Sequence, residues 1–491
     1  MPSGIRMPFD FAHTLREANA RGQREFSELV NPLWGRALSL IGFDQRYVRA
    51  AGASLWDADG REYLDLIAGY ATCNIGRNHP ALVKALTDAL ASGHPSMVQF
   101  ERPSLAGLLA EELVKRVGRG LSRVFFTNSG TEGIETAIKF ARCATGRTAV
   151  MGTRGGFHGL TTGSLSINGC ESFREGFGEF HEGFSCIPFN DLEALERALA
   201  ARTVAAFVCE PIQGKGVNIP DGGYLAEASR ICRLHGTLFV VDEVQTGVGR
   251  TGAFLAIDHE GAVEPDILVL SKALSGGHVP VGAVICRRQV WERVFSRLDR
   301  AIVHSSTFHM GTLAMVAGLA TLAIYDEERL AERALASGAR LADGIRQIAA
   351  RGELIAGVRQ RGLMIGIEFG KPTSLALRAS WRTVHAIDAN LFAQSITMPM
   401  IDDHAILTQV AGHGLDVLKL TPPLVLNEAQ ETRFLAAFGA TMDRLHRGGG
   451  PAWDVLKRIA SNALGVTGRG SATAPADSLG ASAPAPASRD V

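Results

Sequence analysis

The chain lacks the features that mark several classes of protein. Lysine plus arginine and aspartate plus glutamate number 50 each, so no net charge attracts nucleic acid or an anionic membrane. No apolar run is long enough to cross a bilayer, and residues 1–30 lack the apolar core of a secretory signal. The seven cysteines have no paired short spacing, which argues against a zinc knuckle or a disulfide framework. We therefore expect a cytoplasmic protein without a metal site, a nucleic-acid partner or a transmembrane segment, whose cysteines are small buried hydrophobic residues.

Large apolar side chains are almost absent from residues 467–491, which are rich in serine, alanine, proline and glycine. Such a segment cannot bury enough surface to fold. Residues 451–464, just before it, could form one short amphipathic helix.

The chain as a whole is long and apolar enough to form a large core. At 491 residues and 46% hydrophobic, it can bury a large core and divide into two or three domains. Short apolar runs alternate with helical patterns, which predicts an α/β fold with a mostly parallel central sheet and helices on both faces. The expected strands of this sheet are residues 124–126, 205–209, 238–241, 267–270 and 281–285.

A lysine and an aspartate come directly after two of these strands. Lys272 follows the strand at 267–270, and Asp242 ends the strand at 238–241. A lone lysine is normally a solvated surface group, but ligands of open α/β sheets bind at the carboxyl ends of strands. A desolvated lysine can lose its proton and become a nucleophile, and a carboxylate can hold a cationic ring nitrogen. Together the two residues indicate a pyridoxal phosphate site.

A turn rich in small polar residues follows the first expected strand. Residues 126–132 leave that strand and enter a helical pattern, and Ser129 with Glu132 fits an ordinary capping box. The free backbone N–H groups at such a helix start also bind phosphate, here around Ser129, Gly130 and Thr131. With Lys272 expected in the same sheet, we favour the phosphate interpretation.

Two further segments carry candidate site residues. Phe157 and His158 lie between glycines, so either ring could lie flat against a planar cofactor or plug a loop. Glu210 follows the strand at 205–209, where its carboxylate could interact with the lysine, the cofactor or the substrate.

Residues 247–252 match the G-x-G-x-x-G fingerprint of dinucleotide-binding proteins. The fingerprint should open directly from a strand into a helix. Here several residues intervene and the following sequence lacks helical amphipathicity, so an NAD-dependent dehydrogenase is only a remote alternative.

Six ordered motifs resemble those of class III pyridoxal phosphate aminotransferases, the group of ornithine, acetylornithine, putrescine and 4-aminobutyrate aminotransferases. They are residues 128–132, 156–159, 210–214, 241–247, 271–277 and 305–308. The resemblance implies a fold type I homodimer with shared active sites. It also implies an N-terminal segment at 1–75, a large cofactor domain at 76–325 and a small α/β domain at 326–447 that both chain ends build, followed by the tail at 448–491.

The resemblance also assigns roles to single residues. It makes Lys272 the Schiff-base lysine and proton shuttle and Asp242 the partner of the pyridine nitrogen. The other cofactor-binding residues that it implies are Gln245 near the phenolic oxygen, Phe157 stacked on the ring with His158 beside it, Glu210, the phosphate-binding Ser129, Gly130 and Thr131, and Thr307 reaching the phosphate of the neighbouring subunit.

The implied reaction is transamination by a ping-pong mechanism through pyridoxamine phosphate, between an amine or amino acid donor and an oxo acid, aldehyde or ketone acceptor. An aminomutase or another lyase could use the same lysine and aspartate, and stays an alternative. Tyr70 and Lys419 are candidate substrate residues.

The substrate is less clear, because two charged positions differ from the family pattern. Lys215 stands where many relatives have glutamate, and Lys419 where several ornithine and diamine enzymes have arginine. Lysine lacks the bidentate fork of arginine, which puts 2-oxoglutarate in doubt, and Lys419 could be a weaker carboxylate partner or a surface residue. Three segments, at 276–282, 379–382 and 406–414, resemble a subgroup associated with hopanoid side-chain amination. A lipid-like acceptor would then make residues 451–464 a candidate peripheral membrane anchor.

Overall fold

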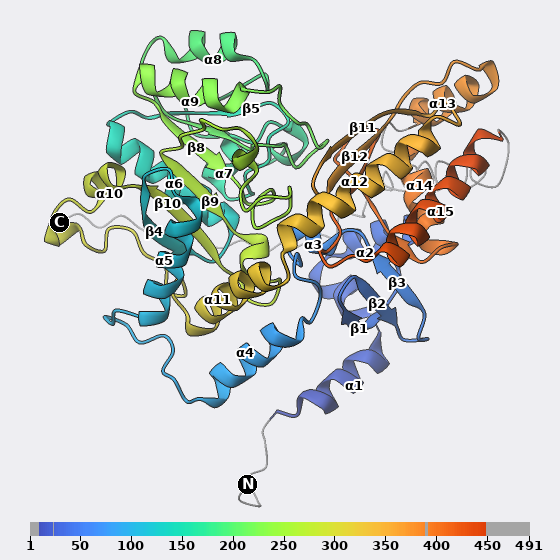
Figure 1. Cartoon of the computed structure of the whole chain (residues 1–491), viewed down its shortest axis with the longest axis horizontal. Helices are drawn as coiled ribbons and strands as arrows, with labels where there is room; N and C mark the ends of the chain where they lie inside the picture. Colours follow the sequence, from blue (N-terminus) through green and yellow to red (C-terminus); the bar gives the residue numbers. More distant parts are fainter. Residues whose placement is uncertain (1–8, 23, 388–390, 448–491) are drawn as a thin grey trace, which may run out of the picture.

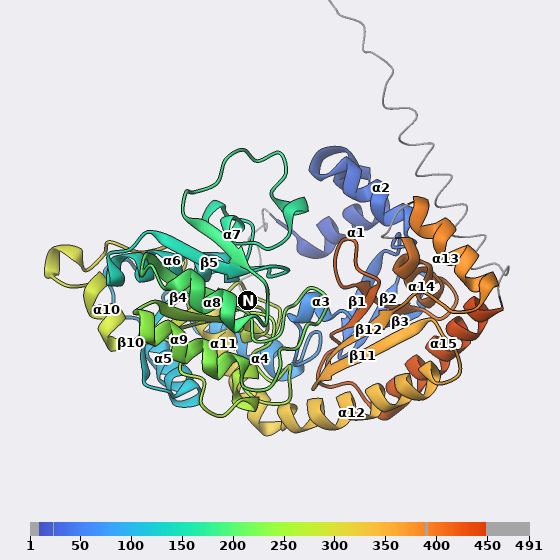
Figure 2. The same ribbon diagram turned by 90° about the horizontal axis from the view of Figure 1, so that it is seen from above.

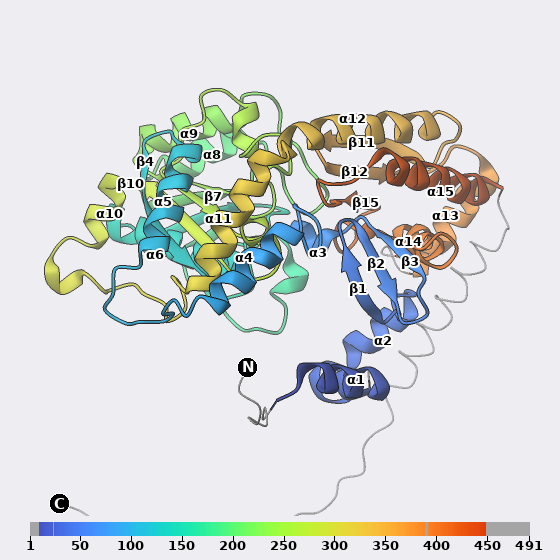
Figure 3. The ribbon, with the colours of Figure 1, turned by 60° about the horizontal axis from the view of Figure 1, so that its bottom comes forward.

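The computed structural model describes residues 9–22, 24–387 and 391–447. The described chain forms two lobes, one around a seven-stranded sheet and one around two four-stranded sheets (Figure 1). Helices α11 (Thr312–Glu327) and α12 (Leu330–Ala349) lead in succession from the larger lobe to the smaller (Figure 3). Within the described part of the chain, no helix combines the length and apolarity needed to cross a membrane.

The sheet of the larger lobe is mostly parallel. Its spatial order is β4 (Leu121–Thr127), β10 (Gly282–Arg287), β9 (Ile267–Leu270), β8 (Leu238–Asp242), β7 (Val204–Cys209), β5 (Ala149–Thr153) and β6 (Phe184–Ile187). Only β10 runs antiparallel to its two neighbours, so the other six strands all point the same way. This confirms the expected architecture.

Helices cover both faces of this sheet because alternate side chains of each strand point to opposite faces. Val240 packs with α6 (Gly130–Thr145) and α10 (Arg288–Val294), whereas Phe239 and Val241 pack on the other face. That second face is covered by α5 (Ser104–Val117), α8 (Leu192–Leu199), α9 (Tyr224–His235) and α11. Because helices cover both faces of these strands, the strand sequences are nearly continuous apolar runs.

The smaller lobe contains two sheets, built from distant parts of the chain. The first has β1 (Tyr47–Ala51), β2 (Ser54–Asp57), β3 (Glu62–Asp65) and β13 (Ile406–Leu407), in which β13 pairs in parallel with β3. The second has β11 (Ile355–Arg361), β12 (Met364–Phe369), β15 (Val417–Leu420) and β14 (Gln409–Val410), all antiparallel. Segments near both chain ends therefore share a sheet, as the family resemblance implies.

The C-terminal helices of the smaller lobe contribute apolar residues to one shared core. These helices are α13 (Leu375–Ile387), α14 (Leu391–Asp402) and α15 (Glu428–His446), and Figure 2 shows α12 and α15 beside β11 and β12. Asn427 accepts a hydrogen bond from Gln430 N and so caps α15. The remaining α-helices are α1 (Phe11–Arg21), α2 (Pro32–Leu40), α3 (Ala68–Ala71), α4 (Pro80–Ala91) and α7 (Thr162–Ser166).

All five expected strands are present, but β5 and β6 were not expected.

All seven cysteines are free; four of them are buried, whereas Cys143 is exposed, so the expectation of buried cysteines is wrong there. The domain boundaries stay predictions. The segments at 451–464 and 467–491 lie outside the described residues.

The G-x-G-x-x-G match at 247–252 lies in successive turns rather than at the start of a helix. Gly249 and Gly252 both have positive φ, and an added Cβ would lie 2.7 Å from a ring carbon of Tyr325 and 2.3 Å from Leu335. These glycines allow close packing against α11 and α12, which accounts for the match without a dinucleotide.

Candidate active site

The candidate residues gather at one edge of the large sheet. Strands β4, β5, β7, β8 and β9 all point toward this edge, so the loops that follow them meet there. Asp242 ends β8, Glu210 follows β7, and Lys272 lies two residues after β9. The fold thus brings together residues that are far apart in the sequence.

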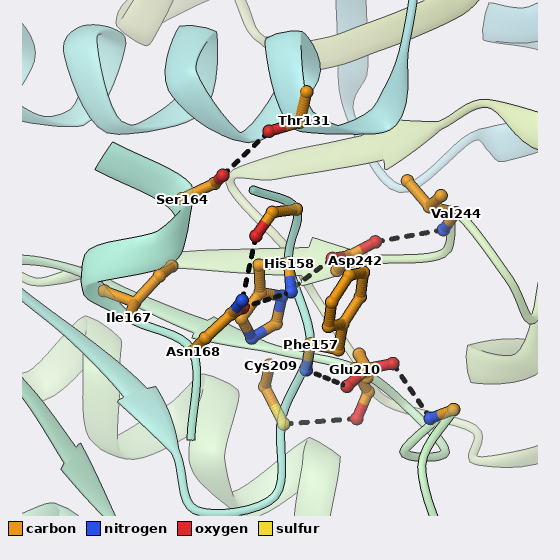
Figure 4. Close-up of polar contacts among 12 residues, drawn as sticks. Thr131, Phe157, His158, Ser164, Ile167, Asn168, Cys209, Glu210, Asp242 and Val244 are labelled. Carbon is orange, nitrogen blue, oxygen red and sulfur yellow. Dashed lines mark hydrogen bonds and ion pairs between the residues drawn. The ribbon is translucent and has the colours of Figure 1, made fainter. Parts of the chain in front are cut away.

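Asp242 is a buried carboxylate held from two sides (Figure 4). Its Oδ2 lies 2.7 Å from Nδ1 of His158, and its Oδ1 accepts a hydrogen bond of 3.1 Å from Val244 N. Asn168 fixes the loop that carries His158, because its Oδ1 accepts a hydrogen bond of 2.7 Å from His158 N. Burial opposes the charged imidazole, but the hydrogen bond and charge of Asp242 raise the pKa of His158 overall. His158 and Val244 N thus hold the carboxylate of Asp242 in place at the end of β8.

Lys272 is an amine in a poorly solvated position. Burial lowers its pKa, and the negative charges of Asp242 and Glu210 oppose part of that effect. Its backbone has a φ of 42°, at the start of a short 3-10 helix (Lys272–Ser275). A left-handed backbone costs a non-glycine residue roughly 1–2 kcal/mol, so the surrounding structure holds Lys272 in place. A larger neutral fraction makes this amine a better nucleophile.

Glu210 ties two loops of the site together. Its Oε2 accepts a hydrogen bond of 3.0 Å from Phe157 N, and its Oε1 accepts one of 2.9 Å from Gly214 N (Figure 4). The carboxylate is buried, and burial raises its pKa. An added Cβ at Gly214 would lie 2.3 Å from Oε1 of Gln245, so a larger residue there would displace that side chain. Glu210 therefore positions the ring of Phe157, in addition to its charge effect on Lys272.

The turn before α6 has the geometry of a helix cap. Ser129 Oγ accepts from Glu132 N at 3.3 Å, as the sequence predicts. The Glu132 carboxylate, however, accepts from Asn128 N and not from Ser129 N, so a full capping box is wrong. The hydroxyl of Thr131 lies 2.7 Å from that of Ser164. The first N–H groups of α6, at Gly130 and Thr131, are the groups that a helix leaves unpaired.

The candidate substrate residues contact one another through Gln245. Gln245 Nε2 donates to the backbone oxygen of Tyr70 at 3.3 Å, and Lys419 Nζ lies 3.5 Å from Gln245 Oε1. Lys419 also donates to the backbone oxygen of Gly214 at 2.9 Å. It is only 6% exposed, so its interpretation as a surface residue is wrong. Burial, followed by the positive charge of Lys272, lowers the pKa of Lys419 to about 7.

Thr307 follows Ser306, whose hydroxyl accepts a hydrogen bond of 2.9 Å from Asn128 Nδ2 in the turn before α6. Thr307 is exposed and lines a cleft with residues that include Met97, Phe100 and Met310. Its expected contact with the phosphate in a neighbouring subunit stays a prediction.

Two contacting residues carried no signal in the sequence. Asn168 contacts the backbone of His158 and Gly159, and Val244 N contacts Asp242, through hydrogen bonds that depend on how the loops fold. The pairing of His158 with Asp242 was also missed, because it joins positions 84 residues apart. Only the position of His158 in a glycine-flanked loop hinted at such a contact.

The residues fit pyridoxal phosphate. Each oxygen of Asp242 accepts one hydrogen bond and has a lone pair left for a protonated ring nitrogen. Lys272 supplies a poorly solvated amine, and the start of α6 supplies N–H groups for a phosphate.

Comparisons with known proteins agree with this assignment. A family model described as aminotransferase class-III matches residues 42–442. The chain is 36% identical over 452 residues to aminotransferase PigE of Serratia sp. (strain ATCC 39006), which covers 86% of this chain but only 53% of PigE, so the chain spans about half of that relative. It is 38% identical over 398 residues to acetylornithine aminotransferase of Mycolicibacterium smegmatis, covering 81% of this chain and 93% of the relative.

Solved structures show the same fold. Ornithine aminotransferase from Toxoplasma gondii, crystallised with partial occupancy of pyridoxal phosphate at its active site, has a TM-score of 0.73 and 30% identity, covering 87% of this chain and 99% of that one. An (S)-enantioselective omega-transaminase from Thermomicrobium roseum has a TM-score of 0.75 and 27% identity, covering 89% and 100%. The chain therefore belongs to the class III aminotransferases, enzymes of fold type I that use pyridoxal phosphate to transfer amino groups.

Proposed function

We propose that Lys272 and Asp242 carry out this transamination between an amine or amino acid donor and an oxo acceptor. The observation that carries the proposal is the poorly solvated amine of Lys272, at the same sheet edge as the buried Asp242. Bound pyridoxal phosphate supplies an electron sink for the charge that develops on the substrate carbon. The protein has to hold that group, move one proton and orient the substrate.

We assign each of these tasks to residues of the site. Lys272 would hold the cofactor, and its poorly solvated amine would take a proton from the substrate carbon and return it. Asp242 keeps the ring nitrogen protonated, and His158 holds the carboxylate in place. Phe157, positioned by Glu210, stacks on the ring, and the turn Ser129, Gly130 and Thr131 binds the phosphate.

We also propose that the enzyme is a cytoplasmic homodimer with shared active sites. Thr307 lines a cleft with the exposed Phe100, and the exposed Phe308 follows it in the chain. Exposed apolar surface of this kind favours a protein partner. In the homodimer, Thr307 would reach the phosphate site of the partner.

The test is a half-reaction measured on the purified holoenzyme. Each candidate donor, namely glutamate, alanine, ornithine, acetylornithine and putrescine, is mixed with the enzyme alone, and the visible absorbance of the cofactor is followed. We expect at least one donor to bleach it, and an added oxo acid to restore it. If no donor bleaches it while an isomerised amino acid accumulates, the aminomutase alternative replaces transamination.

A chemical test of Lys272 accompanies this panel. Borohydride reduction of the wild-type holoenzyme should fix the cofactor to the peptide that contains Lys272, and Lys272→Ala should abolish this labelling. Labelling that survives in Lys272→Ala would contradict the assignment of the lysine.

A further inference from the structure

The side chain of Thr131, in the first turn of α6, contacts the loop that leads into α7. Its Oγ1 lies 2.7 Å from the hydroxyl of Thr161 and, as Figure 4 shows, faces the hydroxyl of Ser164, also at 2.7 Å. It accepts a further hydrogen bond of 3.3 Å from Thr161 N. All three contacts join the start of α6 to this one loop.

The loop uses the full hydrogen-bonding capacity of the Thr131 hydroxyl. A hydroxyl has one proton to donate and two lone pairs to accept with. The Thr161 hydroxyl donates to Glu135 Oε1 at 2.6 Å, so it accepts the proton of Thr131. Thr131 in turn accepts from Thr161 N and from Ser164 Oγ. Its proton is therefore already donated within the chain, and none is left for a phosphate oxygen.

Glu135 holds the same loop from the next turn of α6. Besides the Thr161 proton, its Oε1 accepts a hydrogen bond of 3.0 Å from Ser164 N. Two glycines allow the loop to approach the helix this closely. An added Cβ at Gly159 would overlap Thr131, and one at Gly163 would overlap the carboxylate. The first two turns of α6 thus hold the loop at two points.

The loop held by Thr131 also carries the two rings of the candidate site. The backbone N–H of Phe157 donates to Glu210. The imidazole of His158 pairs with Asp242. Three residues further on, the contact with Thr131 attaches the loop to the turn that we expect to bind phosphate. A shift of that turn would therefore be passed on to both rings.

Ser129 differs from Thr131 in the use of its hydroxyl. Its Oγ accepts a hydrogen bond of 3.3 Å from Glu132 N, which takes up a lone pair and not the proton. A phosphate at the start of α6 would be bound by that proton and by the first backbone N–H groups of the helix.

We propose that Thr131 is a positioning residue, whose hydroxyl locks the loop of Phe157 and His158 to the start of α6. This inference rests on the proposed function and narrows the role of the turn. The Ser129 hydroxyl and the N–H groups of Gly130 and Thr131 bind the phosphate, whereas the Thr131 hydroxyl sets the position of the stacking ring relative to it. A ligand that spans two parts already fixed against each other loses less freedom on binding and binds more tightly.

Inorganic phosphate distinguishes positioning from direct contact. The full-length apoenzyme would be titrated with phosphate and, separately, with pyridoxal phosphate, for wild type, Thr131→Val and Ser129→Ala. Thr131→Val should leave the Kd for inorganic phosphate unchanged and raise that for pyridoxal phosphate about fivefold, because only the second ligand also contacts the ring. Ser129→Ala should raise both Kd values about tenfold, since it loses a hydrogen bond to a charged group. A loss of phosphate affinity in Thr131→Val as large as in Ser129→Ala overturns the proposal.

The visible circular dichroism of the bound cofactor reports how its ring is held. At saturating cofactor, Thr131→Val should weaken this signal, and Thr131→Ser, which keeps the hydroxyl, should restore it. Glu135→Gln should weaken it as well, because Thr161 loses its charged acceptor. The double variant Thr131→Val with Glu135→Gln should be no worse than either single variant, since both break the same connection. The matched control is Thr87→Val on α4, which removes an exposed hydroxyl that donates only within its own helix.

The two titrations and the spectrum also separate this inference from the proposed function. A signal in Thr131→Val and Glu135→Gln equal to that of the control, or two effects that add fully, overturns the role of Thr131 while the enzyme still binds its cofactor. If the wild type does not bind pyridoxal phosphate, the proposed function fails, whereas the inorganic-phosphate titration still decides whether the Thr131 hydroxyl contacts a phosphate.

Discussion

Lys419 is a buried amine whose charge changes near neutral pH. Burial and the charge of Lys272 lower its pKa to about 7, with Lys215 and Arg250 adding to this and Glu210 opposing it. Lysine is charged below its pKa, so Lys419 is a cation under mildly acidic conditions and neutral under alkaline conditions. Its two oxygen partners, on Gly214 and Gln245, carry no formal charge.

A carboxylate substrate should therefore bind less tightly as pH rises through the pKa of Lys419. We expect the KM for 2-oxoglutarate to increase between about pH 6 and about pH 9, because the positive charge is lost. In Lys419→Arg the increase should shrink, since arginine stays charged over this range. The measurement is KM against pH for both proteins. Parallel profiles would assign the pH dependence to another group, such as Lys272.

The turns that follow β8 connect the two lobes of the molecule. Arg250 is completely buried in one of these turns. Its Nη1 donates to the backbone oxygens of Leu363 at 2.9 Å and Pro422 at 2.6 Å, and its Nη2 donates to Asn74 Oδ1 at 2.5 Å. The three partners come from the N-terminal segment and from one end of the antiparallel β12–β15 pair, just before β12 and just after β15. One side chain thus links the sheet edge of the active site to the smaller lobe.

Arg250→Met should destabilise the protein while leaving its surface unchanged. The substitution leaves three buried acceptors without a donor, which costs about 2–4 kcal/mol. The control is Arg197→Met on α8, where the exposed Arg197 pairs only with Glu193 and the expected loss is within about 0.5 kcal/mol. Urea unfolding followed by tryptophan fluorescence compares the two midpoints. A shift no larger than that of the control would show that the arginine contributes little to the contact between the lobes.

The elements that the sequence predicted well are those with one dominant signal. The strands that end at Asp242 and before Lys272 are continuous apolar runs, because helices cover both of their faces. Strand β5 was missed, since its glycine and threonine interrupt that signal. The antiparallel direction of β10 could not be predicted, because strand direction depends on the path of the connection and not on local sequence.

The contacts of the site likewise divide into those that a local pattern predicts and those that only the folded loops show. Lys272 and Asp242 could be placed because each comes right after a strand whose end marks the sheet edge. The burial of Lys419 was not visible, since it results from the central position of β15 between β12 and β14. Lys215 was visible as an unusual charge, but its enclosure by Phe173 requires the folded loop. Local patterns therefore place residues at an edge, and only the assembled loops show which of them touch.

At the scale of the whole molecule, the proposed homodimer would complete each active site with a residue of the second chain. Thr307 is exposed and lies in a cleft whose other lining residues come from 94–105 and 309–312. Phe100, in the same cleft, is fully exposed, and burying such a side chain stabilises an assembly by roughly 1.5–3 kcal/mol. A second copy of the chain that covers this surface would bury the Phe100 ring. Thr307 would then reach the phosphate site of that second copy.

This arrangement predicts complementation between two defective chains. Lys272→Ala should be inactive, and Thr307→Asp should bind the cofactor poorly because its charge repels the phosphate. If Thr307 serves the site of the partner, a mixed dimer places both defects in one site and leaves the other site intact. Co-expression with two different affinity tags, followed by sequential purification, isolates the mixed dimer for assay. Activity well above that of either parent would support the shared site, whereas a mixed dimer as inactive as its parents, or a chain that is monomeric by light scattering, would contradict it.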